Sequence, residues 1–285
     1  MTNPVFSVAF INRWLVCVAI VLLSTSAGLA STIYRAQDAH GNPIYSDIQT
    51  PNARSLKLDP QPSRIAYRVI RVSDGDTVTL EGGKRVRLLG VNAPEIDSHN
   101  RAGEPGGVPA KTWLKDKLQG RNVYLEYDRQ KQDHYQRELA HLYLASGEHI
   151  NLSLVAKGLA AIAIIPPNIR HADAMIRAQQ QAERQRLGIW AMAHYAPRPL
   201  ASLTEKPAGW RRYHAKTRKV KRSRRYTRLI ISGNIDIRIA NSDLALFPSL
   251  EHYLNKRLEV RGWVSRNKNH FSIRVRHPSA LILLE

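Results

Sequence analysis

Two short segments decide the fold: Val-Ser-Asp-Gly-Asp-Thr at residues 72–77 and Arg-Leu-Leu-Gly-Val-Asn-Ala-Pro-Glu at residues 87–95. Between them, two strand-like stretches flank Gly82-Gly83, a pair that favours a two-residue turn between antiparallel strands. Such a turn pairs Glu81 with Lys84, so Val78 faces Arg87 and Asp76 faces Leu89. The pattern predicts a β-hairpin in which Asp76 and Arg87 are diagonal neighbours on one face.

Acidic and amide oxygens gather at the open end of this hairpin. Asp74, Asp76, Asn92 and Glu95 lie there beside Arg87. Such a set can hold a hard cation next to an anion. Hydrolysis of a phosphodiester needs a cation on the phosphate, a carboxylate that activates water, and arginines that bind the developing charge.

Asn92 poses one difficulty for this grouping. Strict alternation along the strand places it on the opposite face from Arg87. Two explanations stay open: Gly90 supplies a bulge that exchanges the faces, or the strand ends there.

A second arginine motif, Asp-His-Tyr-Gln-Arg-Glu-Leu-Ala at residues 133–140, stands at the entry to another predicted strand. With Gly158-Leu-Ala160 and Leu187-Gly-Ile-Trp190, it completes a series of motifs in a fixed order. In this series the chain resembles the staphylococcal nuclease family, from about Ala66 to Trp190. The resemblance implies an oligonucleotide-binding (OB) barrel that hydrolyses DNA and RNA with calcium, although another divalent metal is also compatible.

The resemblance also implies a role for individual residues, in three groups. The catalytic residues are Arg87 and Arg137, which clamp the phosphate, and Glu95, which acts as general base; the metal ligands are Asp76, Asn92 and the backbone carbonyl of Ala93; the substrate-binding residues are His134 and Tyr135.

The chain departs from the family pattern at two places. Asn92 offers an oxygen ligand without the usual negative charge, which predicts weaker calcium binding or a shifted metal preference. After Gly158-Leu-Ala160, where the family type member has tyrosines that touch the base, the chain reads Ala161-Ile-Ala-Ile-Ile-Pro-Pro167. We therefore expect poorer base stacking there. The glycine-rich loop 97–109 is either a mobile substrate loop or a plain surface connection.

The whole chain of 285 residues has 43 Lys and Arg against 23 Asp and Glu, a formal charge of +20. A field of this sign attracts polyanions, meaning nucleic acid or an anionic membrane surface. The single cysteine, Cys17, lies in the apolar N-terminal stretch. This excludes a disulfide framework, a cysteine nucleophile and a thiolate zinc site from the rest of the chain.

The remaining segments suggest the domain organisation. Residues 1–30 have the charged start, apolar run and small residues of a cleaved export signal. An uncleaved membrane anchor is the alternative, but the run is short for a span. Residues 31–60 read as strand, turn and strand, and resemble a small domain of unknown function in exported proteobacterial proteins. The nuclease-like domain is predicted at 64–192, helices within it at 108–118, 150–157 and 169–187, and a basic linker at 193–228.

Residues 229–285 predict a second, OB-like β domain. Strands are expected at 229–231, 235–239, 257–264 and 271–275, with a helical stretch at 243–254 that is interrupted at Pro248. Trp263 is expected in the core of this domain rather than stacked on a base. Residues 206–228 contain eleven Lys and Arg and no acid, so this arm is expected to contact phosphates.

The predicted fold class is therefore a β-barrel with helices (α+β), flanked by a small N-terminal β unit and the OB-like extension. The predicted function is an exported nuclease, periplasmic or secreted, with nucleic acid as partner and no obligate protein partner. After signal cleavage no membrane span is expected. A nucleic-acid-binding protein whose barrel no longer cuts is the alternative, supported by Asn92 alone. A weaker alternative is an envelope protein whose basic arm binds anionic lipid.

Overall fold

The computed structural model describes residues 33–37, 43–46, 51–52, 54–56, 65–98 and 102–284, and divides into two units, 1–61 and 62–285. The first unit contains strands β1 (Ile33–Gln37), β2 (Pro43–Ser46) and β3 (Arg54–Leu56). They form an antiparallel sheet in the order β2-β1-β3, which agrees with the strand–turn–strand pattern. The predicted export signal and Cys17 lie outside the described residues.

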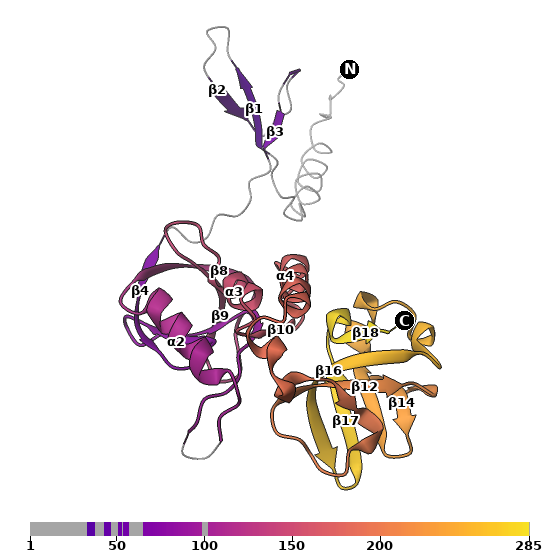
Figure 1. The fold of residues 1–285 in the computed structure, drawn as a ribbon. Coiled ribbons are helices and arrows are strands. Elements are labelled where there is room, and N and C mark those ends of the chain that lie inside the picture. The colour runs from indigo at the N-terminus through magenta and orange to yellow at the C-terminus, as the bar shows by residue number, and fades with distance from the viewer. Residues whose placement is uncertain are drawn as a thin grey trace, which may run out of the picture. The chain divides into compact units, whose positions relative to one another are not determined.

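The second unit begins with a closed five-stranded barrel (Figure 1). Its strands are β4 (Ala66–Val72), β5 (Thr77–Leu80), β6 (Arg85–Leu88), β8 (Asn122–Gln132) and β9 (Glu138–Tyr143), joined in the order β4-β5-β6-β9-β8. β6 and β9 are parallel and the other pairs are antiparallel. The barrel with helices that the sequence predicts is confirmed.

The predicted register of the first hairpin is wrong by one residue. Thr77 is opposite Arg87 and Val78 is opposite Val86, and the turn is a three-residue loop from Glu81 to Gly83. Both Gly82 and Gly83 have positive φ angles, 82° and 81°. Two successive residues with positive φ occur in both two-residue and three-residue hairpin loops. The presence of two glycines therefore does not decide the register.

The strand that carries Arg87 ends at Leu88, and a new one starts at Gly90 with φ of 73°. The new strand, β7 (Gly90–Asn92), leaves the barrel and pairs with β10 (Ala161–Ala163), where Asn92 faces Ala161. Gly90 has a φ that residues with a side chain rarely adopt, and a Cβ there would also lie 2.5 Å from the Met175 sulfur, so glycine is strongly favoured at this position. Of the two explanations for Asn92, the end of the strand is therefore the correct one.

Three helices cover the barrel: α2 (Gly107–Leu118), α3 (Ile150–Ala156) and α4 (Ala172–Arg184). α4 is shorter at both ends than the predicted helix 169–187. His171 and Arg186 have positive φ angles, which a right-handed helix does not accommodate. Leu114, Leu154 and Met175, one from each helix, are fully buried against the barrel strands.

Two 3-10 helices, η1 (Gly188–Ala191) and η2 (Ala193–Tyr195), lead into a second β domain. Its strands are β11 (Arg198–Pro199), β12 (Trp210–Lys216), β13 (Lys219–Arg222), β14 (Tyr226–Ser232), β15 (Ile235–Ala240), β16 (Arg257–Asn267), β17 (His270–Val275) and β18 (Leu281–Leu283), with 3-10 helices η3 (Leu200–Ser202), η4 (Asn241–Leu246), η5 (Leu250–Tyr253) and η6 (Pro278–Ala280). The predicted strands are confirmed, and the predicted helical stretch is two 3-10 helices separated near Pro248.

The predicted linker at 193–228 is wrong for residues 210–228, which form β12, β13 and the start of β14. The strands are joined in the order β12-β16-β17-β15-β14-β13, with β15 and β17 parallel. β12 and β13 are separated only by Thr217 and Arg218, so they are two halves of one bent strand. This bent strand thus stands at both ends of the strand order, as β12 at one end and β13 at the other. The resulting order, with one parallel pair, is the same as in the first barrel. The linker prediction failed because lysine and arginine dominate the outward positions of this strand.

A salt-bridge network joins the second β domain, whose bent sheet is called the second barrel from here on, to α4. Glu183 accepts two hydrogen bonds from Arg261, of 2.6 and 2.8 Å, and Arg212 forms two bonds to Glu259, of 2.8 and 2.9 Å. Arg261 is only 6% exposed and also donates to Glu259. The guanidiniums of Arg212 and Arg261 lie 5.5 and 5.9 Å from the ring centre of Trp190. Charge and packing thus hold the two barrels together at one interface.

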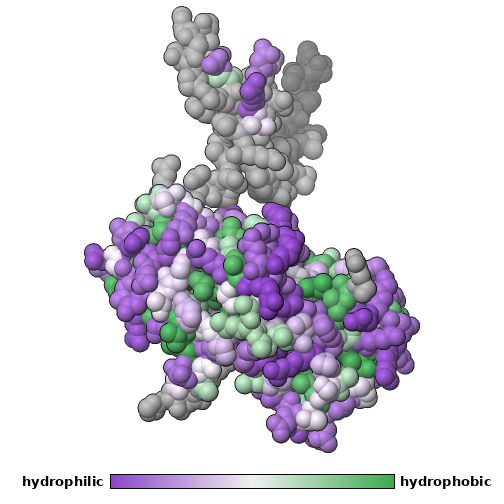
Figure 2. Space-filling view, viewed as in Figure 1, coloured by the Kyte–Doolittle hydropathy of each residue, from purple (hydrophilic) through white to green (hydrophobic). Residues whose placement is uncertain are grey.

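An apolar core continues across the same interface. Trp190 and Trp210 are buried with their ring centres 6.3 Å apart, and Ala161, Ala182, Ile189 and Tyr195 belong to the same buried cluster. The viewed surface is mainly hydrophilic, with scattered hydrophobic patches (Figure 2). Among the described residues, no helix is long and apolar enough to cross a membrane.

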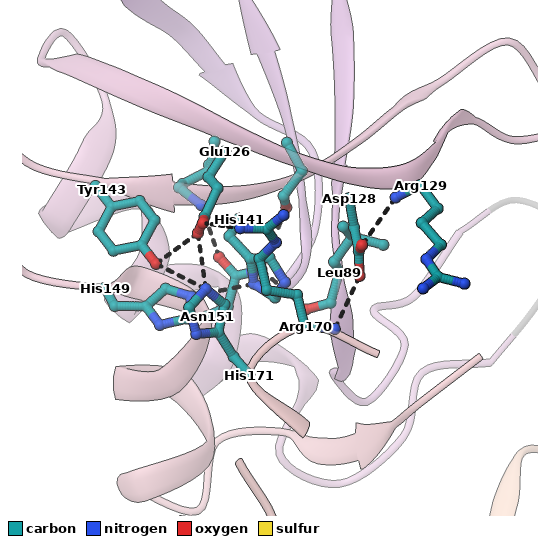
Figure 3. A network of polar contacts seen from close by, with 12 residues as sticks. Leu89, Glu126, Asp128, Arg129, His141, Tyr143, His149, Asn151, Arg170 and His171 are labelled. Atoms are coloured by element: carbon teal, nitrogen blue, oxygen red, sulfur yellow. Dashed lines mark hydrogen bonds and ion pairs between the residues drawn. The ribbon is translucent and has the colours of Figure 1, made fainter. Parts of the chain in front are cut away.

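Three histidines form a polar cluster between β8, β9, α3 and α4 (Figure 3). His141 and His149 share a hydrogen bond of 3.1 Å, and His171 lies 2.7 Å from a carboxylate oxygen of Glu126, which also accepts from the Tyr143 hydroxyl at 2.8 Å. Burial and, to a smaller extent, the neighbouring histidines lower the pKa of His141 to about 2 and that of His149 to about 4. His141 and His149 are therefore neutral in the folded protein at neutral pH.

Candidate active site

A small polar pocket opens where β5, β6 and the segment after β7 meet. Its walls are formed by residues from the two segments that decide the fold and by one more arginine: Asp74, Gly75, Asp76, Arg87, Ala93, Pro94, Glu95 and Arg137. All three predicted catalytic residues and two of the three predicted metal ligands are in this set. Gly75 allows the 74–76 turn to lie close to Ala93, because a Cβ on residue 75 would lie 2.5 Å from the Cβ of Ala93.

Asp76 is the buried carboxylate of the pocket and is 7% exposed. One of its oxygens accepts the Ala93 N–H at 2.9 Å and lies 2.9 Å from Arg87, and Asp74 accepts the Asp76 N–H at 3.0 Å. Burial, opposed by the positive charge of Arg87 and aided by the adjacent Asp74, raises the pKa of Asp76 to about 7. A cation at this carboxylate would stabilise its ionised form.

Arg87 is held in a single position by three contacts. It donates to the carbonyls of Leu88 and Val91 at 2.8 and 2.9 Å, and its ion pair with Asp76 is the third. A guanidinium carries five N–H groups. These contacts leave two of them for a phosphate in the pocket.

Arg137 is fixed by the turn that precedes it. Asp133 accepts the backbone N–H of Arg137 at 3.0 Å and two guanidinium contacts at 2.8 Å. The turn requires Gln136 to adopt a φ of 60°. Burial acts to raise the pKa of Asp133, but the bonds from Arg137 outweigh it and keep the pKa below the ordinary value. Asp133 is therefore an ionised anchor that aims Arg137 into the pocket.

Glu95 is half-buried and lines the same pocket as the buried Asp76. The loop behind it is tied down, because Glu104 donates its backbone N–H to the Glu95 carbonyl at 2.8 Å. α2 begins directly against this carbonyl: a Cβ on Gly107 would lie 2.3 Å from it. The start of α2 thus fixes the backbone of Glu95, while its side chain lines the pocket.

The other predicted site residues lie outside this pocket. Asn92 and His134 line a larger adjacent cleft, together with Arg87 and Arg137. Tyr135 is 66% exposed, its ring lies 3.8 Å from that of His134, and the Arg137 guanidinium is 5.5 Å from its centre. Asn92 lies on β7, beyond the end of the barrel strand that carries Arg87, and it lines the cleft.

The oxygen donors of the pocket suit a hard divalent cation. Asp74, Asp76 and Glu95 supply carboxylates, and Ala93 supplies a carbonyl, whereas soft thiolate donors are absent from its lining. In the described part of the chain, no cluster of three or more His, Cys, Asp or Glu is arranged as a preformed metal site. Asp74 was grouped with the site by the hairpin pattern but was not among the predicted ligands.

Known proteins match the region that builds this pocket. A family model described as staphylococcal nuclease homologue matches residues 85–192. The thermonuclease of Staphylococcus intermedius is 38% identical over 128 residues, which cover 44% of this chain and 76% of the relative. The chain belongs to the staphylococcal nuclease family. Endonuclease YncB of Bacillus subtilis is 30% identical over 168 residues, covering 56% of the chain and 77% of that enzyme.

Membership of the staphylococcal nuclease family confirms the predicted enzyme class, a phosphodiester-hydrolysing nuclease. The matched region contains Arg87, Glu95 and Arg137 and ends before β12. The cleft that Asn92 lines extends beyond it, since Trp263 and Arg276 of the second barrel also belong to its walls. The sequence did not predict either residue in the site: the strand pattern places Trp263 in the core, and nothing in the sequence near Arg276 links it to the pocket.

Proposed function

We propose that this protein is an exported nuclease that hydrolyses DNA, RNA or both, with a divalent metal, preferably calcium, bound in the pocket of Asp76. The convergence of Asp76, Arg87, Glu95 and Arg137 on one pocket carries the proposal. Asp76 and the carbonyl of Ala93 would hold the metal, with Asn92 as the proposed third ligand. The metal would neutralise charge on the phosphate when bound.

In the proposed reaction Glu95 takes a proton from a water molecule as that water attacks the phosphorus. The phosphorus–oxygen bond to the leaving nucleoside breaks, and the leaving oxygen takes a proton from solvent. Arg87 and Arg137 donate hydrogen bonds to the phosphate oxygens, on which negative charge builds in the transition state. Both arginines are fixed before the substrate arrives, Arg87 by carbonyls and Asp76, and Arg137 by Asp133. This supports the role of a clamp, because little reorganisation is needed during the reaction. His134 and Tyr135 would contact the substrate next to Arg137.

The test compares the Glu95→Gln variant with the wild type on plasmid DNA and on RNA, with added calcium and with a chelator. The variant is expected to cleave at least about 100-fold more slowly while binding nucleic acid normally, because it removes only the base. Glu81→Gln, at the exposed hairpin turn, is the matched control and should cleave at the wild-type rate. Full activity of Glu95→Gln would exclude Glu95 as the base, and chelator-resistant cleavage would exclude the metal.

Export is tested separately, by expressing the full chain in a bacterium and determining the N-terminus of the protein outside the cytoplasm. The proposal expects a mature protein that begins after Ala30, where small residues precede the predicted cleavage point. An intact N-terminus on protein retained in the cytoplasm would contradict it.

A further inference from the structure

Trp263 is exposed although it lies in the middle of a buried strand. Its neighbours Gly262 and Val264 on β16 are buried, whereas Trp263 is 42% exposed. The prediction that it belongs to the core is therefore wrong: Trp210, directly opposite on β12, occupies the core of the interface instead. A large exposed aromatic side chain on a rigid strand is a natural contact surface for a ligand.

The exposed ring lines the cleft that contains the proposed phosphate clamp. The cleft walls include Arg87 and Arg137 on one side and Trp263 and Arg276 on the other, with Ala163 and Ile165 also contributing. The arginines of the pocket and the tryptophan of the second barrel thus face one cavity. A phosphate held by the arginines would therefore lie at a wall of the same cleft that Trp263 lines.

The position of Trp263 is set by the interface between the barrels. Arg261, two residues earlier on β16, is buried and forms its two bonds to Glu183 of α4. Trp210, its cross-strand neighbour, packs against Trp190. Because both neighbours are fixed to the nuclease barrel, the backbone of Trp263 is held beside the cleft before a ligand binds, which reduces the ordering cost of binding.

The nuclease barrel itself offers few aromatic groups to a base here. β10 contributes Ala163 to the cleft, Ile165 follows it, and within the described residues His134 supplies the only other ring in the lining. This agrees with the expectation of poor stacking after Gly158-Leu-Ala160. The ring missing from β10 is supplied by the second barrel.

A row of arginines leads from Trp263 over the face of the second barrel. Arg276 lines the cleft, and Arg274 and Arg238 lie side by side on the paired strands β17 and β15. The guanidiniums of Arg238 and Arg274 lie 5.4 and 5.9 Å from the ring centre of Tyr226. Burial, together with Arg274, lowers the pKa of Arg276, as expected where positive charges exceed negative ones. Phosphates would relieve this excess.

We propose that the second barrel completes the substrate site: Trp263 stacks on an unpaired base next to the cleaved phosphate, and Arg276, Arg274 and Arg238 bind the phosphates of the following nucleotides. The proposal rests on the nuclease function above and specifies its substrate as a single strand, since stacking requires an unpaired base. The observation that carries it is the joint lining of one cleft by Trp263, Arg87 and Arg137.

The test is a double-mutant cycle between the protein and the substrate. Labelled single-stranded octanucleotides, intact or with one abasic position, are titrated with full-length protein carrying Glu95→Gln, with and without Trp263→Ala. The tryptophan change is expected to weaken binding of the intact strand by about 5- to 150-fold. With the abasic site at the stacking position, the same change should have no further effect. Leu246→Ala, another exposed apolar residue of the second barrel, is the control and should bind normally.

Equal binding of the intact strand by the Glu95→Gln protein with and without Trp263→Ala would overturn the proposal, and so would equal losses at every abasic position. If the alanine variant fails to fold, Trp263→Phe replaces it; partial retention of affinity and sensitivity to the same abasic position are then expected. For the arginines, Arg276→Gln should reduce the slope of log affinity against log salt by about 1. Arg257→Gln, exposed elsewhere on β16, should reduce it less.

The two proposals fail in different ways. If cleavage is independent of Glu95, the nuclease mechanism fails whatever Trp263 does. If cleavage depends on Glu95 but Trp263→Ala leaves KM and binding unchanged, only the role of the second barrel fails. For a residue that binds the base and takes no part in the chemistry, the Trp263→Ala change is expected to raise KM and to leave kcat unchanged at saturating substrate.

Discussion

Replacing His141 and His149 together by leucine is expected to flatten the dependence of stability on pH. In the wild type both side chains are neutral when folded, with pKa values of about 2 and about 4. In the unfolded chain their pKa is about 6.5. Between pH 6.5 and pH 4.5 the unfolded state therefore binds more protons, and the stability that neutral histidines contribute at high pH is lost as the pH falls.

The size of the effect follows from the number of protons. Near pH 5 the unfolded wild type holds about two more protons on these histidines than the folded protein, which corresponds to about 2.7 kcal/mol per pH unit. Integrated from pH 6.5 to pH 5, the loss is about 3 kcal/mol. Glu126, Tyr143, His171 and Arg170 face the pair and remain in the variant.

Asp76 contributes with the opposite sign. Because its pKa in the folded protein is raised to about 7, it favours folding at low pH and loses this contribution as the pH rises towards 7. The contribution is present in both proteins and cancels from their difference. The quantity to compare is therefore the difference in slope between wild type and variant, and the cost of the leucines themselves also drops out.

The assay is urea denaturation followed by circular dichroism at half-unit steps from pH 5 to pH 7, for the wild type, the double variant and a His252→Leu control. His252 lies exposed on η5, away from the histidine cluster, and serves as the matched histidine-to-leucine control. Parallel lines for the wild type and the double variant would refute the reasoning, because they would mean that the two histidines take up protons equally in both states.

Three further outcomes are expected. Arg87→Lys and Arg137→Lys should each lower kcat, since lysine keeps the charge but cannot present two parallel donors, and an arginine at such a site is worth roughly 10³–10⁵ in rate; single-turnover cleavage measures this. Arg261→Met should cost about 3 kcal/mol, because Glu183 loses both of its hydrogen bonds from Arg261 and the buried Glu259 keeps only Arg212 as a partner; restoration of the melting temperature by Glu183→Met in the same chain would identify the pair as the cause. Asn92→Asp should lower the calcium concentration for half-maximal cleavage if this side chain reaches the metal, and an unmoved midpoint would remove it from the ligand set.

The sequence predicted the first barrel and most of its pocket because those features depend on local chemistry. Gly75 allows the turn to approach Ala93, and Asp76 and Arg87 meet even though the hairpin register was misplaced by one residue. The shift did not separate them, because the long arginine side chain reaches across a neighbouring position. A contact that depends on side-chain length survives such an error.

The errors arose where distant parts of the chain decide the outcome. Residues 210–216 contain four basic or histidine side chains, and only their pairing with β16 reveals a strand. Trp263 has the flanking residues of a core position, but Trp210 from the opposite strand fills that core. Which of the two paired tryptophans is buried depends on the packing of both strands, so the sequence of either strand alone does not predict it.

The apolar core shared by Trp190 and Trp210 has a consequence for synthesis. A chain made from its N-terminus completes the first barrel before β12 and β16 exist. Until they arrive, the side of that barrel formed by Ala182, Ile189 and Trp190 has no cover, and Glu183 has no Arg261. Pausing or truncation in this interval would leave a folded catalytic barrel with an exposed apolar patch that favours aggregation. The solubility of the nascent chain therefore depends on how soon the last seventy or so residues are synthesised.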